Sequence, residues 1–95
     1  MISRETVAQL LDYDPATGDF RWKVRRSGMK AGSIAGTLDS DGNRVIRINR
    51  RMYIAHRLAW LLVKGRWPKS PIQHRNCIKD DNRFANLREA LVSPR

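Results

Sequence analysis

The chain has 95 residues, of which 41% are hydrophobic, and its three Trp, two Tyr and two Phe supply core material for one small domain. Its single cysteine excludes a disulfide framework and a cysteine-based zinc site. No signal peptide is recognised, and the longest apolar stretch, residues 58–63, is too short to span a bilayer. We therefore expect a cytoplasmic protein without a membrane partner.

The charge is strongly positive and unevenly distributed. Nineteen Lys and Arg face nine Asp and Glu, a formal net charge of +10. Residues 20–66 hold twelve of the basic side chains against Asp39 and Asp41, whereas residues 1–19 are net negative. Such a concentration predicts a polyanionic partner, because each Lys or Arg placed against a phosphate releases a condensed counterion. A solvated basic face that only maintains solubility is the alternative.

The first part of the chain predicts a helix, a turn and a strand. Residues 3–11 favour a short helix with an N-terminal Ser cap and one apolar face. Residues 14–18 combine Asp, Pro and Gly in a turn. Residues 20–24 alternate apolar and basic, which predicts a strand with Arg21 and Lys23 on its outer face.

The middle of the chain predicts a hairpin followed by a helix. Residues 43–48 read as a strand, residues 49–51 as a tight turn, and residues 52–54 as a second short strand. The helix is expected over Ala55–Lys64 and should end at Gly65.

The end of the chain predicts a brief strand within residues 70–74 and a last helix from about Arg83, stopped by Pro94. Three apolar residues at helical spacing motivate that helix: Phe84, Leu87 and Leu91. Three tryptophans are expected to fill the core and its joints: Trp22, Trp60 and Trp67. The predicted fold class is α+β, with an N-terminal helix, a small antiparallel sheet, a helix and a C-terminal ββα unit.

Residues 71–90 read PIQHRNCIKDDNRFANLREA. This stretch resembles the ββα-metal motif of HNH endonucleases of the phage and homing-endonuclease branch, which runs roughly Ile-Asp-His-Ile-Asn-Gly-Asp, then Asp-Asn-Arg and Asn-Leu-Arg. The segment AHRLAW at residues 55–60 is similar to the family's approach to the motif, and residues 12–22 resemble its amino-terminal opening. The resemblance implies one HNH-like domain, with a basic DNA-binding part at residues 20–66 and the ββα motif at residues 70–93.

The resemblance also assigns roles to residues of the motif. In active relatives, an acidic residue just before the histidine and an Asn or His on the following helix hold a divalent metal, while the histidine is the general base. His74 matches the general base, and Asn86 matches an Asn that braces the loop. The two ligand positions are occupied by Gln73 and Arg95.

These departures predict a nuclease site that is inactive. Magnesium prefers carboxylate oxygen, so Gln73 removes a charge from the site and Arg95 adds a cation to it. No metal ligand and no cofactor are therefore expected, and Mg²⁺ or Mn²⁺ would be needed only if the site is active. His74 is then a vestigial general base, retained for structure or for contact with a phosphate.

Four further residues of the motif region have structural interpretations. His56 is expected to pack at the start of its helix, and Asp80 and Asp81 to supply negative charge at a helix N-terminus. Cys77 stands where the family usually has Gly and is expected to be a small buried or half-buried residue.

The resemblance implies that residues 32–65 form a sheet-plus-helix unit that grips DNA. Ten basic residues are candidates for contact with double-stranded DNA: Arg21, Lys23, Arg25, Arg26, Arg44, Arg47, Arg50, Arg51, Arg83 and Arg88. The hypothesis is a DNA-binding phage-type protein, acting as a regulator or as an inhibitor of a host nucleic-acid machine, with a host nucleic-acid-bound protein complex as a further partner. An active HNH endonuclease that nicks DNA is one alternative, and a protein-binding module is another.

Overall fold

A computed structural model describes residues 2–25 and 28–90. The elements are, in chain order, α1 (Arg4–Leu10), β1 (Leu11–Tyr13), β2 (Phe20–Trp22), β3 (Thr37–Leu38), β4 (Arg44–Ile48), β5 (Arg51–Ile54), α2 (Ala55–Lys64), β6 (Ile72–His74), the 3-10 helix η1 (Phe84–Asn86) and β7 (Leu87–Glu89). The strands form three antiparallel units, β1–β2, β3–β4–β5 and β6–β7. The fold class is α+β, as the sequence predicts. No helix of the described ranges is long and apolar enough to cross a bilayer.

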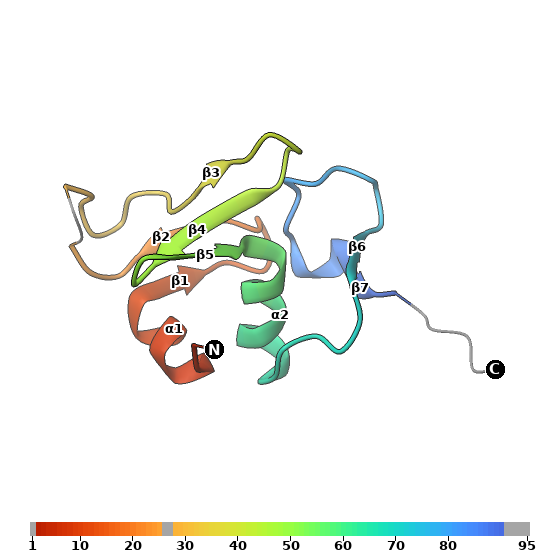
Figure 1. Cartoon of the computed structure of the whole chain (residues 1–95), viewed down its shortest axis with the longest axis horizontal. Helices are drawn as coiled ribbons and strands as arrows, with labels where there is room; N and C mark the ends of the chain where they lie inside the picture. The colour runs from red at the N-terminus through yellow and green to blue at the C-terminus, as the bar shows by residue number, and fades with distance from the viewer. Residues whose placement is uncertain (1, 26–27, 91–95) are drawn as a thin grey trace.

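Helix α2 is the element around which the others pack. It lies between the β3–β4–β5 sheet, helix α1 and the β6–β7 hairpin (Figure 1). Gly65 ends it as predicted, with a φ of 78° and an N–H that donates to the Leu61 carbonyl at 2.9 Å. The core collects residues from every layer: Val7, Leu11, Phe20, Trp22, Ala35, Ile46, Ile48, Ala55, Leu58, Ala59, Trp60, Leu61 and Leu87.

The predicted first helix is present, and a strand follows it directly. Ser3 caps the helix, because its side chain accepts from the Thr6 N–H at 3.2 Å. Strand β1 was not expected from the sequence. It pairs with β2, with Leu11 opposite Trp22, and the alternation of buried and exposed residues predicted for β2 is confirmed.

The β4–β5 hairpin turns through two residues of left-handed backbone. Asn49 and Arg50 have φ values of 51° and 69°, which a two-residue turn of this kind requires at both positions. The register places Ile48 opposite Arg51 and Arg47 opposite Met52. Because side chains alternate along a strand, Arg47 and Met52 share the face opposite the buried Ile48.

The helix predicted from Arg83 is wrong for the described residues. They form η1 and then β7, which pairs with β6 so that His74 lies opposite Leu87. The spacing of three residues between Phe84 and Leu87 fits an α-helix, and it also fits a single 3-10 turn followed by a strand. Leu87 is buried, as its apolar character predicts. The last part of the predicted helix, including Leu91, lies outside the described residues.

Gly18 joins the amino-terminal turn to the loop before η1. Its φ is 82°, and a Cβ added there would lie 2.5 Å from the Arg83 nitrogen and 2.5 Å from the Asn82 carbonyl carbon. Gly32 has a similar φ of 89° but open space around it. Comparing an alanine substitution at each glycine therefore distinguishes the cost of backbone strain from the cost of close packing.

We expect Gly18→Ala to lower the free energy of unfolding by about 3 kcal/mol or more, because left-handed strain and overpacking add. Gly32→Ala should cost only the strain, about 1–2 kcal/mol. Urea unfolding followed by tryptophan fluorescence measures both values. Equal losses would show that the contact between Gly18 and the Asn82–Arg83 backbone is unimportant.

Candidate functional site

His74, at the end of β6, is held by a buried amide. Its Nε2 lies 2.9 Å from Oδ1 of Asn82, a residue that is 1% exposed. Since an amide oxygen can only accept, Nε2 is the donor of this hydrogen bond, and Nδ1 takes no part in it. The His74 ring also meets the ring of His56, at the start of α2, edge to face at 5.0 Å.

Asn86 connects the two ends of the loop that follows His74. The side chain is 6% exposed and makes three hydrogen bonds. Its Oδ1 accepts from the Asn76 N–H at 3.0 Å, and its Nδ2 donates to Asn76 Oδ1 at 2.9 Å and to the Asp81 carbonyl at 2.8 Å. These hydrogen bonds hold the two ends of the loop together, as expected for a bracing residue. A contribution of Asn86 to activity stays a prediction.

No α-helix follows Asp80 and Asp81 in the described residues, so the expected charge at the N-terminus of the last helix is wrong. The single-turn 3-10 helix η1 begins at Phe84 and has no side-chain cap. Asp81 accepts from Arg83 Nη2 at 2.7 Å and from Asn76 Nδ2 at 2.6 Å. Its hydrogen bonds with Arg83 hold the pKa of Asp81 well below its usual range. Asp80 receives two hydrogen bonds from the Arg44 guanidinium, at 2.7 and 3.0 Å, which raise the pKa of Arg44. The two carboxylates thus fasten the loop to itself and to β4.

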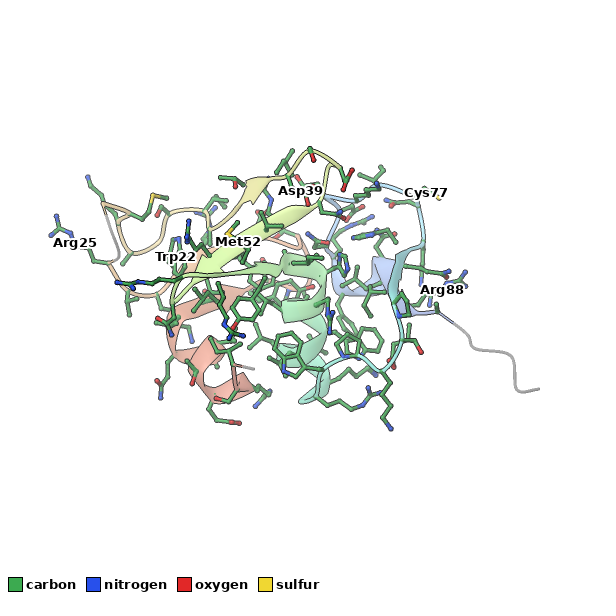
Figure 2. The ribbon with its side chains drawn as sticks, in the orientation of Figure 1. Trp22, Arg25, Asp39, Met52, Cys77 and Arg88 are labelled. Carbon is green, nitrogen blue, oxygen red and sulfur yellow. The ribbon has the colours of Figure 1, made fainter. Side chains whose placement is uncertain are left out.

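Gln73, at the position of the expected acidic ligand, is paired with an arginine. It is exposed on β6 directly opposite Arg88 of β7, whose Nε donates to Gln73 Oε1 at 3.0 Å. Beside this pair is an open pocket of about 440 Å³, lined by Gln73, His74, Arg75, Cys77, Lys79 and Arg88. Figure 2 shows Cys77 and Arg88 at one end of the molecule and Arg25 at the other.

The residues present do not fit a divalent metal. Among residues 2–25 and 28–90, no group of three or more His, Cys, Asp and Glu side chains is placed to hold one. The Gln73 oxygen is neutral and already accepts from a guanidinium, so a cation stands beside the ligand position. The second ligand position, Arg95, lies outside the described residues.

Cys77 and His56 have different environments. Cys77 is exposed, so the expected burial is wrong, and its φ of 63° explains why this turn position favours Gly. His56 is half-buried at the start of α2, in the packing position expected for it. Burial, together with the nearby His74 and Arg57, lowers the pKa of His56 to about 4.

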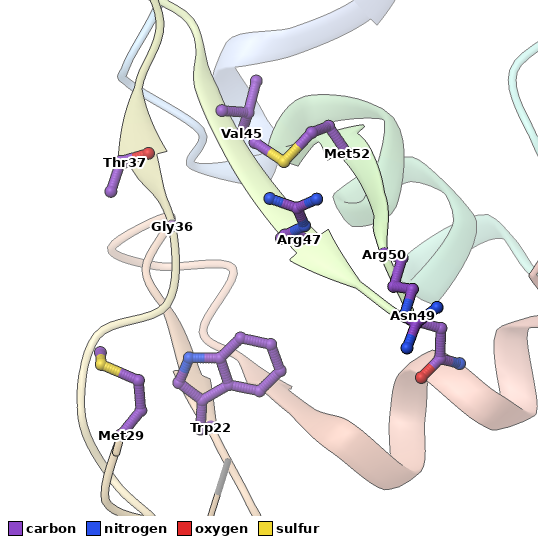
Figure 3. A pocket seen from close by; sticks show the side chains of 9 residues that line it. All are labelled: Trp22, Met29, Gly36, Thr37, Val45, Arg47, Asn49, Arg50 and Met52. Carbon is purple, nitrogen blue, oxygen red and sulfur yellow. The ribbon is translucent and has the colours of Figure 1, made fainter. Parts of the chain in front are cut away.

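The outer face of the β3–β4–β5 sheet carries part of the predicted DNA-binding set. Arg47 and Arg50 line a hollow of about 670 Å³ together with apolar side chains that include Met52 and Met29 (Figure 3). Trp22 forms part of its wall and is 7% exposed, in agreement with a core residue. No acidic residue lines this hollow.

Other described candidates lie away from this hollow, so the structure does not bring the described candidates to one face. Arg51 lines a different hollow with residues of α1. Arg21 Nη1 donates to the Gly32 carbonyl and Lys23 Nζ to the Ala8 carbonyl, both at 2.8 Å. Arg44 and Arg83 are bound to carboxylates, Arg88 to Gln73, Arg25 is exposed, and Arg26 lies outside the described residues.

Sequence reasoning missed Asn82 as a partner of His74. Asn82 belongs to the Asp-Asn-Arg part of the motif, but nothing in the sequence shows that its amide faces the histidine. The backbone carbonyl of Asn82 accepts a hydrogen bond from the Tyr13 hydroxyl, which connects the β1–β2 hairpin to the site. Burial, followed by the charges of Asp14 and Asp81, raises the pKa of Tyr13 above its ordinary value.

The loop after β6 therefore contacts His74 through Asn82 and is braced by Asn86. Residues 53–92 match the family model described as HNH endonuclease. The resemblance inferred from the sequence is therefore confirmed over the end of β5, α2 and the β6–β7 hairpin, and this segment indicates a function that involves nucleic acid. Residues 12–22 lie outside the match, and their resemblance stays a prediction. No curated protein and no solved structure matched the chain.

The low pKa of His56 predicts a pH-dependent stability. The folded state keeps this imidazole neutral down to about pH 4, whereas an unfolded histidine protonates below about pH 6.5. The contribution of neutral His56 to the free energy of unfolding is therefore complete above pH 6.5 and is lost as the pH falls toward 4. Urea unfolding should show a lower free energy of unfolding at pH 5 than at pH 7, and this difference should be smaller in His56→Gln. An unchanged decrease in the variant would contradict the assignment.

The Gln73–Arg88 pair predicts that the unmodified chain does not bind Mn²⁺ in the absence of DNA. Gln73→Asp should gain little, because the new carboxylate would face Arg88 and form an ion pair with it. Calorimetric titration with Mn²⁺ checks both proteins, with Asp12→Asn as a control for nonspecific carboxylate binding. Saturable heat with the unmodified chain would contradict the prediction.

Proposed function

We propose that the protein binds double-stranded DNA without cutting it. The observation that carries this proposal is the Gln73–Arg88 pair, which puts a guanidinium beside the position at which active relatives hold a metal. The net charge of +10 supplies the attraction to DNA.

The outer face of the β3–β4–β5 sheet is the proposed contact surface. It presents Arg47 and Arg50 away from the core, with no acidic side chain among the residues that line the hollow between them. Arginine suits this position, since its guanidinium can contact phosphate or the edge of guanine with two parallel hydrogen bonds. The apolar surface of Met52, which is 55% exposed, lies on the same face.

The absence of cleavage follows from the chemistry that remains. His74 remains at the position of the general base, and general-base catalysis contributes about 10²–10⁴-fold. Hydrolysis of a phosphodiester requires far more, and a metal normally supplies it by stabilising the leaving oxygen and the phosphate charge. A chain that occupies DNA without cutting would block other proteins there. This is the action of a regulator, or of an inhibitor of a host nucleic-acid machine in the cytoplasm.

An active endonuclease is the second candidate. The orientation of His74 favours it, because the bond from Nε2 to Asn82 fixes the ring and leaves Nδ1 to accept a proton from water. It requires a metal bound chiefly by DNA phosphates, with no carboxylate from β6. We prefer DNA binding alone, because Arg88 would repel that metal.

Binding to a duplex should weaken steeply with salt. If four to six phosphates are neutralised, log K should fall against log salt with a slope of about −4 to −5. Fluorescence anisotropy with a labelled duplex measures this slope. A flat response, or no binding at low salt, would favour a protein-binding module instead.

The outer face is tested by two neighbouring arginines that point to opposite sides of the hairpin. Arg47→Gln should weaken binding and reduce the salt slope by about one, because it removes one phosphate contact. Arg51→Gln, an equal change of charge on the side of α1, should leave the slope nearly unchanged. Equal effects would mean that total charge alone matters.

A further inference from the structure

The pocket beside β6 and β7 gathers cations and contains no carboxylate among its lining residues. Arg75, Lys79 and Arg88 line it from three points of the chain, and His74 adds a ring nitrogen. The sheet face proposed to bind DNA is a different surface, with no lining residue in common. The pocket therefore requires an explanation of its own.

Arg88 is oriented for an anion. Its Nε is committed to Gln73 Oε1 at 3.0 Å, and this bond fixes the plane of the guanidinium. The two terminal nitrogens then remain as a fork of N–H donors, the geometry that matches two oxygens of one phosphate. A glutamine amide thus serves as an anchor for the arginine, whereas a carboxylate would neutralise it.

Lys79 is also positioned by the fold. Its Nζ donates to the Asp41 carbonyl at 3.0 Å, which holds the ammonium near the β3–β4 turn and leaves two further protons for other acceptors. Arg75 is exposed at the start of the loop, and its backbone N–H is bonded to the Asn86 carbonyl at 2.7 Å. Two cations on one braced loop thus stand near the Arg88 fork.

Three neighbouring carboxylates have cationic partners outside the pocket. Asp80 binds Arg44, and Asp81 binds Arg83. Glu89, next to Arg88 on β7, accepts from Arg66 at 3.1 Å and from the Lys69 N–H at 2.6 Å. Asp41, whose backbone carbonyl accepts from Lys79 Nζ, is a further acid near the pocket. None of these acids is among the residues that line the pocket, so every formally charged side chain in the lining is positive.

We propose that this pocket binds a phosphate group without a metal, with the Arg88 fork as its principal ligand and with Arg75 and Lys79 as supporting cations. The source rests on the proposed function: it is a backbone phosphate of DNA, and free inorganic phosphate offers the same chemistry. The pocket would thus hold a backbone phosphate of the bound strand beside His74, where active relatives cleave the strand.

Cys77 provides a local reporter. It is the only cysteine of the chain, it is exposed, and it lines the pocket. The rate of its alkylation by iodoacetamide, a neutral reagent, should fall when a phosphate occupies the pocket. The measurement is made on the full chain with inorganic phosphate at constant ionic strength in chloride, and separately with a saturating DNA duplex.

Phosphate should protect Cys77 in the unmodified chain and equally in Arg4→Gln, which loses the same charge far from the pocket. Arg88→Gln should require about tenfold more phosphate for equal protection, because charge-assisted hydrogen bonds are lost. Gln73→Glu, which keeps all three cations, should lose protection too, since the new carboxylate would occupy the Arg88 guanidinium. The same pattern with the duplex identifies the DNA backbone as the source.

No protection beyond that by chloride, or equal protection in Arg88→Gln and Arg4→Gln, would overturn the phosphate site. If the duplex binds with a steep salt slope but Cys77 alkylation does not change with phosphate or duplex, the pocket fails and DNA binding stands. If inorganic phosphate protects Cys77 in an Arg88-dependent way but the duplex does not bind, the pocket stands and the proposed function fails.

Discussion

Two buried carboxamides, those of Asn82 and Asn86, hold together the part of the molecule that resembles a nuclease. They are the two buried polar residues of the described ranges, and an unpaired amide in such a place would destabilise the fold. Asn86 joins the ends of the loop after β6, and Asn82 joins His74 to the loop before η1. The position of every side chain around the pocket depends on this loop.

The same loop links the ends of a short chain. The Tyr13 hydroxyl donates to the backbone carbonyl of Asn82, and Gly18 packs against the peptide that joins residues 82 and 83. Asp80 forms a salt bridge with Arg44 of β4. These contacts join the three small β units in addition to their shared core. A domain of this size has a limited core, so polar cross-links of this kind contribute a large share of its specificity.

The sequence predicted the regular elements well where periodicity and turn chemistry agree. Helix α2 and its end at Gly65 are as predicted, because an apolar helical face and a left-handed glycine point to the same boundary. The error at Arg83 arose because Phe84 and Leu87 satisfy helical spacing, while β7 is determined by pairing with β6, a contact that local patterns do not encode. Strand β3 is only two residues long, too short to show a pattern. Strand β1 begins directly after α1, so Leu11 fits the apolar face expected for the helix.

The motif named candidate site residues, but not the side chains to which they are hydrogen-bonded. His74, Asn86 and Gln73 follow from the motif, whereas the bonds of His74 to Asn82 and of Gln73 to Arg88 depend on strand register and on loop closure. The candidate DNA-binding arginines show the same limit. Composition places them in the middle of the chain, but the pairing of β4 with β5 decides that Arg47 and Arg51 point to opposite faces.

We propose that this scaffold keeps the histidine of a nuclease without the capacity to use it for cleavage. Nicking of supercoiled plasmid in Mg²⁺ and in Mn²⁺ decides this, with the unmodified chain and His74→Ala assayed side by side. Both proteins should leave the plasmid supercoiled to the same extent as buffer alone. Robust nicking by the unmodified chain that His74→Ala abolishes would contradict it.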